Sequence, residues 1–542
     1  MKRGKVVSFM LALTALLLAG CGNAGKDASG QVLKLSASAP LDTIDISKAT
    51  GYGQTGNVFE SFYRLGRKGR AEPGLAKSGR VSADGLTWTF RIRNARWSNG
   101  DPITADDFVY SWRRTIDPKT ASPYSYLFSG IRNADAIAAG RLDKSRLGIR
   151  ALDRHTVQVR LEKPIAYFKV LLAYPLFGPQ NQKVIEKYGK KYATKSKYMV
   201  YSGPFRMTGW NGTSDKWNFV KNDRYWDRDK VKLKKITYKV VENTNTGYQL
   251  YLQNKLDMTP LSNQQVRNLS GSSEFRQYPY SLVAYLAYNF QDRNPVVRKA
   301  LNNRNIRLAF SLALDRKVLT KKVFGDGSSI PTGFVAGGLA YDPKTGRDFA
   351  EEQKVPGTVG HDEKKARELF ERGMAEIGEK SLTVSILAAN DSANNVPLTQ
   401  YLQSQYTKVL PGIKVNLTSI PGKSASDRAG RGDFDIYVSG WGGDFNDPIT
   451  FLQIPLAGTS YNYGKYSNPA YDALIGKAGN EDANDADKRW QDLVSAARIF
   501  NSDQGVTPVY QQTTAYMQKK HVRGIVHNTA GTQWSYKYAY IK

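Results

Sequence analysis

The sequence predicts an α/β protein with more than one domain. A strand, helix, strand pattern runs from residue 382 to 417, with alternating apolar residues at both ends and a helical apolar stripe between them. A second alternating segment, Leu86 to Ile92, leads into a capped helix that starts near residue 104. Because domains usually hold about 100 to 200 residues, a chain of 542 residues should contain two or three of them.

The first residues predict an export signal that ends at a lipidated cysteine. An apolar run from Val6 to Leu18 follows a basic start, and its roughly 13 residues are too few for the roughly 20 of a spanning helix. The string Leu18-Ala19-Gly20-Cys21 contains the only cysteine of the chain and resembles a bacterial lipoprotein box. We therefore expect residues 1–20 to be a signal peptide, acyl chains on Cys21 to anchor the chain, and residues 21–30 to form a flexible tether.

The net charge of +30 indicates a strongly basic surface. Lys and Arg are spread over the whole length without a recognisable nucleic-acid motif, so we expect no nucleic acid as a partner. The polyanions outside a cell are wall polymers and lipid head groups. We interpret the charge as a surface adaptation that can also steer acidic ligands.

The segment that starts at Asp84-Gly85 predicts a strand followed by a helix. After this turn dipeptide, the residues that share one strand face are Leu86, Trp88, Phe90 and Ile92. Thr104 with Asp107 three residues on predicts a helix N-terminus. The expected buried positions of this helix are Phe108, Trp112 and Thr115, and the expected outward positions are Arg113 and Arg114.

The string from Gly51 to Gly56 spells G-x-G-x-x-G, the pattern of dinucleotide-binding loops. It follows a polar segment and not a buried strand, which argues against a dinucleotide site. The better interpretation is a loop that leads into a helix holding Val58, Phe59 and Phe62.

A glycine-rich string follows the third strand that we predict, Phe434 to Ser439. Open α/β sheets bind ligands beyond the carboxyl ends of their strands, so Asp444 would lie where a ligand binds. Without side chains at Gly440, Gly442 and Gly443, another backbone could approach and pair, as in strand addition of an extended peptide. A structural turn-capping role for Asp444 is the alternative.

Enzyme patterns are missing from the sequence. It has four histidines, no H-E-x-x-H or G-x-S-x-G string, and a single cysteine that we expect to carry lipid. We therefore expect no enzymatic activity, no catalytic residue, no metal and no cofactor. A site made of carboxylates alone stays open, as does sugar stacking on the many Trp and Tyr side chains.

Five segments, in this order along the chain, resemble the extracellular solute-binding proteins that deliver oligopeptides to ABC importers. The segments are Asp84 to Arg114, Ser202 to Phe205, Asn222 to Asp227, Asn305 to Arg316 and Gly440 to Pro448. The sequence departs from the family pattern twice: Asp223 stands where the family commonly has Pro, and both residues between Trp441 and Asp444 are Gly.

The resemblance implies a periplasmic-binding-protein-like fold of two lobes with a hinge and an extra third domain, the type II or cluster C architecture. The implied ligand-binding lobes are domain I and domain III, and the extra domain is domain II. The expected bounds are 31–66 plus 200–287 plus 509–542 for domain I, 67–199 for domain II and 288–508 for domain III.

The resemblance also implies the function and the site. Asp444 would bind the α-amino group of an oligopeptide held between the lobes, and the protein would pass it to the permease subunits of an ABC transporter. The other expected ligand contacts are Gly440, Trp441, Gly442, Gly443 and Phe445, with Tyr52, Gly53 and Asn57 from the opposite lobe. We expect a monomer at the extracellular face of a Gram-positive cell membrane. A pheromone sensor, adhesin or surface chaperone without a transport role is the alternative.

Overall fold

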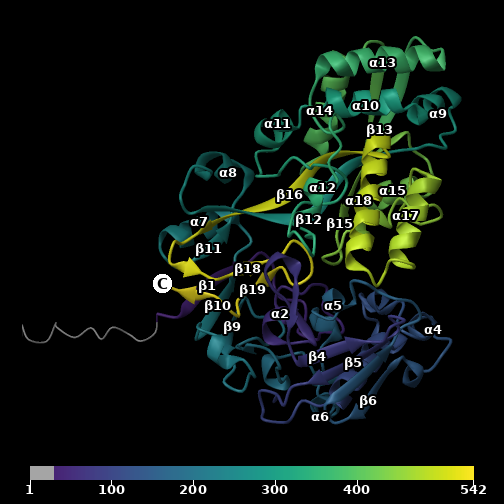
Figure 1. Ribbon diagram of the computed structural model, residues 1–542. Helices are drawn as coiled ribbons and strands as arrows, with labels where there is room; N and C mark the ends of the chain where they lie inside the picture. The colour runs from purple at the N-terminus through teal and green to yellow at the C-terminus, as the bar shows by residue number, and fades with distance from the viewer. Residues whose placement is uncertain (1–29) are drawn as a thin grey trace, which may run out of the picture.

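The computed structural model describes residues 30–542, and the expected signal peptide and Cys21 lie outside the described residues. Figure 1 shows an upper lobe, mostly green and yellow, and a lower lobe, mostly purple to teal, which also contains the yellow C-terminal end of the chain. Two long antiparallel strands, β12 (Phe275–Tyr288) and β16 (Val506–Gln518), connect the two. In the part of the chain that is described, no helix is both long and apolar enough to cross a membrane.

The first sheet of the lower lobe has the strand order β1-β10-β9-β8. Its strands are β1 (Val32–Ala37), β8 (Phe205–Thr208), β9 (Lys216–Lys221) and β10 (Lys235–Val240), with β1 parallel to β10 and the other pairs antiparallel. Its core joins distant parts of the chain, because Leu33, Trp217 and Tyr536 are buried in one cluster. The N-terminal, middle and C-terminal segments therefore fold together.

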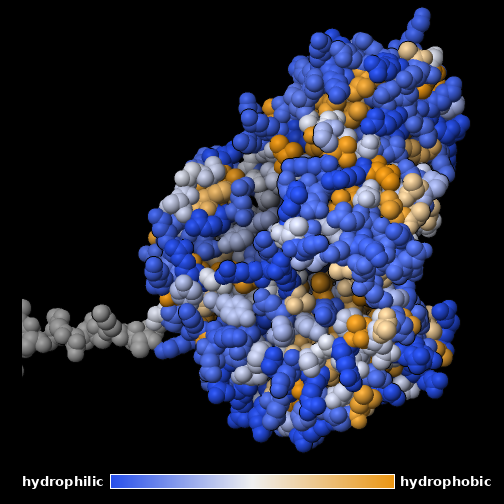
Figure 2. Space-filling view, in the orientation of Figure 1, coloured by the Kyte–Doolittle hydropathy of each residue, from blue (hydrophilic) through white to orange (hydrophobic). Residues whose placement is uncertain are grey.

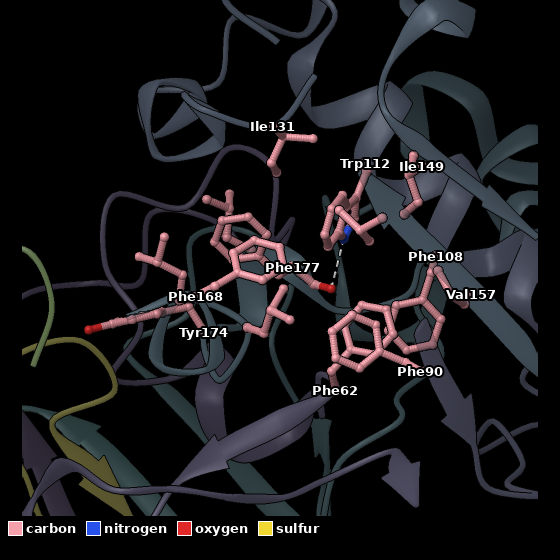
Figure 3. Packing of buried hydrophobic residues seen from close by; sticks show 14 of the residues in the cluster. Phe62, Phe90, Phe108, Trp112, Ile131, Ile149, Val157, Phe168, Tyr174 and Phe177 are labelled. Carbon is pink, nitrogen blue, oxygen red and sulfur yellow. Dashed lines mark hydrogen bonds between the residues drawn. The ribbon is translucent and has the colours of Figure 1, made fainter. Parts of the chain in front are cut away.

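The second sheet of the lower lobe has the order β4-β5-β7-β6. Its strands are β4 (Ala76–Val81), β5 (Thr87–Ile92), β6 (Ile149–Asp153) and β7 (Thr156–Arg160). As predicted, Trp88, Phe90 and Ile92 are buried. Figure 3 shows Phe90 packed with Phe62 and Phe108 in an aromatic core.

Helix α3 (Ala105–Ile116) covers this sheet and begins where the sequence predicts. Thr104 and Asp107 form a capping box, and Trp112 donates a hydrogen bond from Nε1 to the carbonyl oxygen of Phe177 at 2.9 Å (Figure 3). The prediction that Arg114 points outward is wrong. Its guanidinium is mostly buried and binds both carboxylate oxygens of Asp45, at 2.6 and 2.8 Å. The helix is thereby joined to the N-terminal segment.

The sequence predicts a helix that holds Val58, Phe59 and Phe62, but the helix ends at Val58, so the prediction is wrong for the two phenylalanines. Helix α2 covers only Thr55–Val58, and Phe59 has an extended backbone. Phe59 is buried in the core of the first sheet, whereas Phe62 is buried in the core of the second. A continuous helix would put residues three apart on one face. The chain instead crosses between two cores here and must extend.

The third sheet has the order β11-β16-β12-β15-β13-β14 and forms the centre of the upper lobe. The strands not yet given are β11 (Met258–Pro260), β13 (Leu382–Ala389), β14 (Ile413–Ile420) and β15 (Ile436–Gly442). The predicted strand, helix, strand unit is confirmed, with β13 and β14 parallel and α14 (Asn395–Val409) between them. Near the start of α14, Val396 is exposed and Leu398 is buried.

Helices cover both faces of the third sheet. One face packs against α9 (Pro295–Asn302), α10 (Arg304–Ala313), α13 (Glu363–Ile377) and α14. The other packs against α15 (Gly422–Gly430), α16 (Ile449–Leu452), α17 (Pro469–Gly479) and α18 (Ala486–Asp503). The remaining α-helices are α4 (Ala134–Ala138), α5 (Phe168–Leu171), α6 (Gln182–Tyr188), α7 (Thr244–Leu252), α8 (Asn263–Leu269), α11 (Arg316–Val318) and α12 (Phe349–Glu352). Short strands are β2 (Tyr63–Leu65), β3 (Ala71–Pro73), β17 (Val522–Arg523), β18 (Val526–His527), β19 (Trp534–Ser535) and β20 (Tyr540–Ile541).

The connection between the lobes is irregular at two points. The register of β12 on β16 shifts between Pro279 and Val283, and a second register shift falls between Ala284 and Tyr285. Proline cannot donate to a ladder and a bulge bends a strand, so the first point is the natural place for the pair to flex. The domain limits expected at residues 287 and 508 fall inside β12 and β16, beyond this first point.

Candidate functional site

One edge of β15 has no strand partner beside two glycines. β12 pairs with β15 as far as Gly442, whereas β13 pairs with it only at Ile436 and Tyr437. The strand therefore spans Ile436–Gly442, and the predicted bounds of Phe434 and Ser439 are wrong at both ends. Among residues 30–542 no other strand pairs with Val438 to Gly442 on the side away from β12. An extended chain could add to this edge by main-chain hydrogen bonds.

The glycines of this segment differ in how much space surrounds the position that a Cβ atom would occupy. A Cβ atom at Gly442 would meet nothing within 4 Å, and one at Gly440 would lie 3.5 Å from the carbonyl oxygen of Val283. A Cβ at Gly443 would lie 3.1 Å from both Leu339 and Thr450. Gly442 therefore leaves open space beside the free edge, whereas a side chain at Gly443 would crowd Leu339 and Thr450.

A cavity of about 390 Å³ lies beside the free edge. Its aromatic lining consists of Tyr285, Tyr437, Trp441, Tyr461, Tyr463 and Tyr510, and Gly440 also lines it. Trp441 and Tyr461 are 4.9 Å apart between ring centroids, and Tyr461 is half exposed. Apolar and aromatic groups of varied shape could pack against these rings.

Asp444 follows β15 directly and offers a carboxylate. Its amide donates to Thr450 Oγ1 at 3.0 Å, and its Oδ1 accepts a hydrogen bond from the Tyr126 hydroxyl at 3.2 Å. Burial raises the pKa of the Asp444 carboxyl above its ordinary value. Within residues 30–542 the carboxylate forms no ion pair. A half-buried carboxylate without a cation can stabilise a positive group of a ligand.

Four tyrosines from the lower lobe surround Asp444. The Tyr52 ring lies 5.2 Å from both Tyr124 and Tyr174, and the Tyr174 hydroxyl donates to the Asp444 carbonyl oxygen at 3.3 Å. Burial, followed by the neighbouring tyrosines and Asp444, raises the pKa of Tyr52 well above its ordinary value. The structure thus brings together Tyr52 and Asp444, two of the expected contacts, from opposite lobes.

Asn57 and Phe445 lie in packed surroundings. The fully buried Asn57 donates to the carbonyl oxygens of Gly53 and Trp534 at 3.1 and 2.8 Å, and it accepts from the Tyr536 amide at 2.9 Å. Phe445 is 5% exposed and stacks on Tyr167 at 4.4 Å. Their contact with a ligand stays a prediction.

Gly53 lines a separate cavity of about 280 Å³ at the end of β1. Ser36, Ser38 and Trp534 also line it. The contact of Gly53 with a ligand stays a prediction too.

Sequence reasoning missed Tyr124, Tyr126 and Tyr174. The only signal was the local richness in tyrosine around residues 124–126, and nothing in the spacing linked it to a segment more than 300 residues away. Metal-binding groups give no further candidates: among residues 30–542, no cluster of three or more His, Cys, Asp and Glu side chains could hold a metal ion.

Known proteins match this chain over nearly all of its length. The family of bacterial extracellular solute-binding proteins, family 5 Middle, matches residues 70–463. The dipeptide-binding protein of Lactococcus lactis subsp. cremoris is 37% identical, and the oligopeptide-binding protein OppA of Bacillus subtilis is 31% identical, each match covering 100% of both chains.

Solved structures agree with these matches. Listeria monocytogenes OppA bound to peptide is 36% identical with a TM-score of 0.69, over 95% of this chain and 100% of that one. The unliganded open form of the murein tripeptide-binding protein MppA is 28% identical with a TM-score of 0.82, over 95% and 98%. The fold is the two-lobe type II architecture, as the resemblance implies. With a match across most of its length and relatives of more than 30% identity, the chain belongs to family 5 of the bacterial extracellular solute-binding proteins.

Proposed function

We propose that this protein captures oligopeptides between its lobes and delivers them to the permease of an ABC importer. The observation that carries the proposal is the free edge of Val438 to Gly442 next to Asp444. Several relatives are named dipeptide- or oligopeptide-binding proteins, and one solved relative is called an oligopeptide ABC transporter substrate-binding domain. Domain I and domain III, with the bounds expected from the sequence, are the clasping parts.

Main-chain pairing would make binding largely independent of peptide sequence. The free edge supplies backbone groups that every peptide can match, and Asp444 supplies a negative charge at one end for the α-ammonium. The aromatic cavity beside Gly440 would then accept peptide side chains. This combination favours a free N-terminus and tolerates many side chains.

Calorimetry with a short unmodified peptide and its N-acetylated counterpart tests this proposal. Binding of the unmodified peptide, with much weaker binding of the acetylated one, is the expected result. The absence of any peptide binding would contradict the proposed function. Mass spectrometry of peptides that co-purify with the protein would then identify its natural ligands.

Peptide binding should close the lobes. The TM-score is higher to an unliganded open form than to peptide-bound OppA, although the latter is more similar in sequence. A cavity of about 350 Å³ between residues 163–167 and 449–489 is a gap where the two lobes meet, and Figure 2 shows the surface notched between them. Small-angle X-ray scattering should therefore give a smaller radius of gyration with saturating peptide. An unchanged radius would favour a rigid groove.

Replacement of the cysteine in the predicted lipoprotein box should release the protein from the membrane. The expectation rests on the string Leu18 to Cys21. Cell fractionation of Cys21→Ser after a high-salt wash measures it, because salt screens the attraction of a basic surface to anionic lipids. A variant that stays in the membrane pellet would refute the lipid anchor.

A signalling role is the second candidate. The pheromone receptor PrgZ is 34% identical with a TM-score of 0.69, over 94% of this chain and 99% of that one. Uptake of a labelled peptide by cells with and without this protein separates the two roles, since a sensor without a transport function would leave uptake unchanged.

A further inference from the structure

Five arginines line one cavity on the second sheet of the lower lobe. The cavity has a volume of about 400 Å³, and its arginines are Arg113, Arg132, Arg146, Arg150 and Arg160. None of the residues around Asp444 lines it. It is therefore distinct from the peptide site that we propose.

Backbone hydrogen bonds hold two of these arginines, Arg132 and Arg160, together through Gly148, which lies between Arg146 and Arg150 in the sequence. The amide of Arg132 donates to the carbonyl of Arg160 at 2.9 Å, Gly148 donates to Arg132 at 2.9 Å, and Arg160 donates to Gly148 at 2.8 Å. A Cβ at Gly148 would lie 2.6 Å from the carbonyl oxygen of Arg160 and 2.7 Å from Cβ of Arg132. Only glycine allows three arginine-bearing segments to meet this closely.

The positive charges of the cavity are only partly balanced by the protein, since Asp84 lies within electrostatic reach of Arg160. Within residues 30–542 none of the five arginines forms an ion pair, and the salt bridge of this region joins Lys144 to Asp117. Arg113 donates to the carbonyl oxygen of Ser145 at 3.0 Å, and its buried Nε has no hydrogen-bond partner. Arg150 donates to the Gln158 side chain at 3.0 Å. The site thus keeps unused donors and a strong positive potential.

We propose that this arginine cavity binds the phosphate groups of a phosphodiester polymer. Guanidinium groups match phosphate oxygens in bidentate geometry, and a polymer can place successive phosphates near several arginines at once. The concave shape suits a chain of discrete phosphates better than a flat lipid surface. In Figure 1, β6 lies at the lower right, far from the left-hand end near β1 where the described chain begins. If the chain is anchored through its N-terminus, the cavity is away from the anchor.

The test compares matched variants of the whole protein. Arg146→Gln with Arg160→Gln removes two exposed cavity charges, and Lys364→Gln with Arg367→Gln removes two exposed charges from α13 in the upper lobe. Calorimetry with poly(glycerol phosphate) at low salt should show binding to the wild type. The cavity pair should weaken it about tenfold, through the loss of charge-assisted hydrogen bonds. The α13 pair should change it less than about twofold, and added salt should weaken binding.

Three results would overturn the proposal. One is no binding of poly(glycerol phosphate) to the wild type. Another is an equal loss in both variant pairs, which would mean that net charge alone drives association. The third is binding to phosphatidylglycerol vesicles but not to the polymer. The cavity pair should also keep its affinity for an unmodified peptide, so the outcome does not depend on whether the proposed peptide function holds.

Discussion

Asp444→Ala should weaken the binding of unmodified peptides by at least about 100-fold, because loss of one partner of a buried charged pair costs on the order of 3 to 5 kcal/mol. The carboxylate is half buried, forms no ion pair within residues 30–542, and lies at the end of the free β15 edge. The α-ammonium of a peptide would stay buried and unpaired in the variant. Calorimetry with a short peptide measures the loss.

N-acetylated peptides provide the control for Asp444. They lack the ammonium group, so they should bind the wild type poorly and lose much less affinity on mutation. The difference between the two losses is the coupling energy of the pair. Equal losses for both peptides would leave Asp444 a structural turn residue, held by its amide bond to Thr450.

Tyr126→Phe separates positioning from charge pairing. The Tyr126 hydroxyl donates to the Asp444 carboxylate at 3.2 Å, so its removal should cost less than the removal of the carboxylate, about 1.5 to 3 kcal/mol for a hydrogen bond to a charged group. A loss as large as that of Asp444→Ala would mean that Tyr126 itself binds the peptide.

The pH dependence of binding follows from the same carboxyl group. Burial raises its pKa, and only the ionised form pairs with an ammonium group. Affinity for unmodified peptides should therefore fall as the pH drops through this raised pKa. Acetylated peptides should show no such fall. The matched pair of peptides thus assigns the titration to Asp444.

Local patterns in the sequence predict the elements that depend on local chemistry. The capping box of Thr104 and Asp107, the alternation before Ile92 and the strand, helix, strand unit all lie where they are predicted. Each depends on residues that are close in sequence, so the pattern and the physical cause coincide.

Elements fixed by distant contacts could not be predicted in the same way. Phe59 and Phe62 enter two different cores, which no helical pattern reveals. Arg114 finds its partner in Asp45, 69 residues away. The Asp444 site is similar: the carboxylate was predicted, but the tyrosines around it come from the other lobe. In each case contacts between distant residues determine which local conformation forms, and the local sequence alone favours none of these conformations strongly.

Glu60→Ala should be among the most destabilising single changes in the lower lobe. The Glu60 side chain is fully buried, and its Oε2 accepts from Arg64 at 2.8 Å and from the Tyr225 hydroxyl at 2.7 Å. Its removal leaves the buried Arg64 guanidinium without a counter-charge, which costs about 3 to 5 kcal/mol in the free energy of unfolding. Urea denaturation of the variant and the wild type measures the difference.

Asp427→Ala is the matched control, because Lys423 and Asp427 form an exposed ion pair with the same spacing of four residues. Its loss should be within about 0.5 kcal/mol, as is usual for exposed pairs on a helix. A similar small loss for Glu60→Ala would mean that water or Ser535, a neighbour of Arg64 at 3.5 Å, compensates the guanidinium. A large loss would show that Glu60 joins Tyr225 to Arg64, which in turn binds the carbonyl oxygen of Gly56 in α2. Burial, and not spacing along the chain, would then decide what an ion pair contributes.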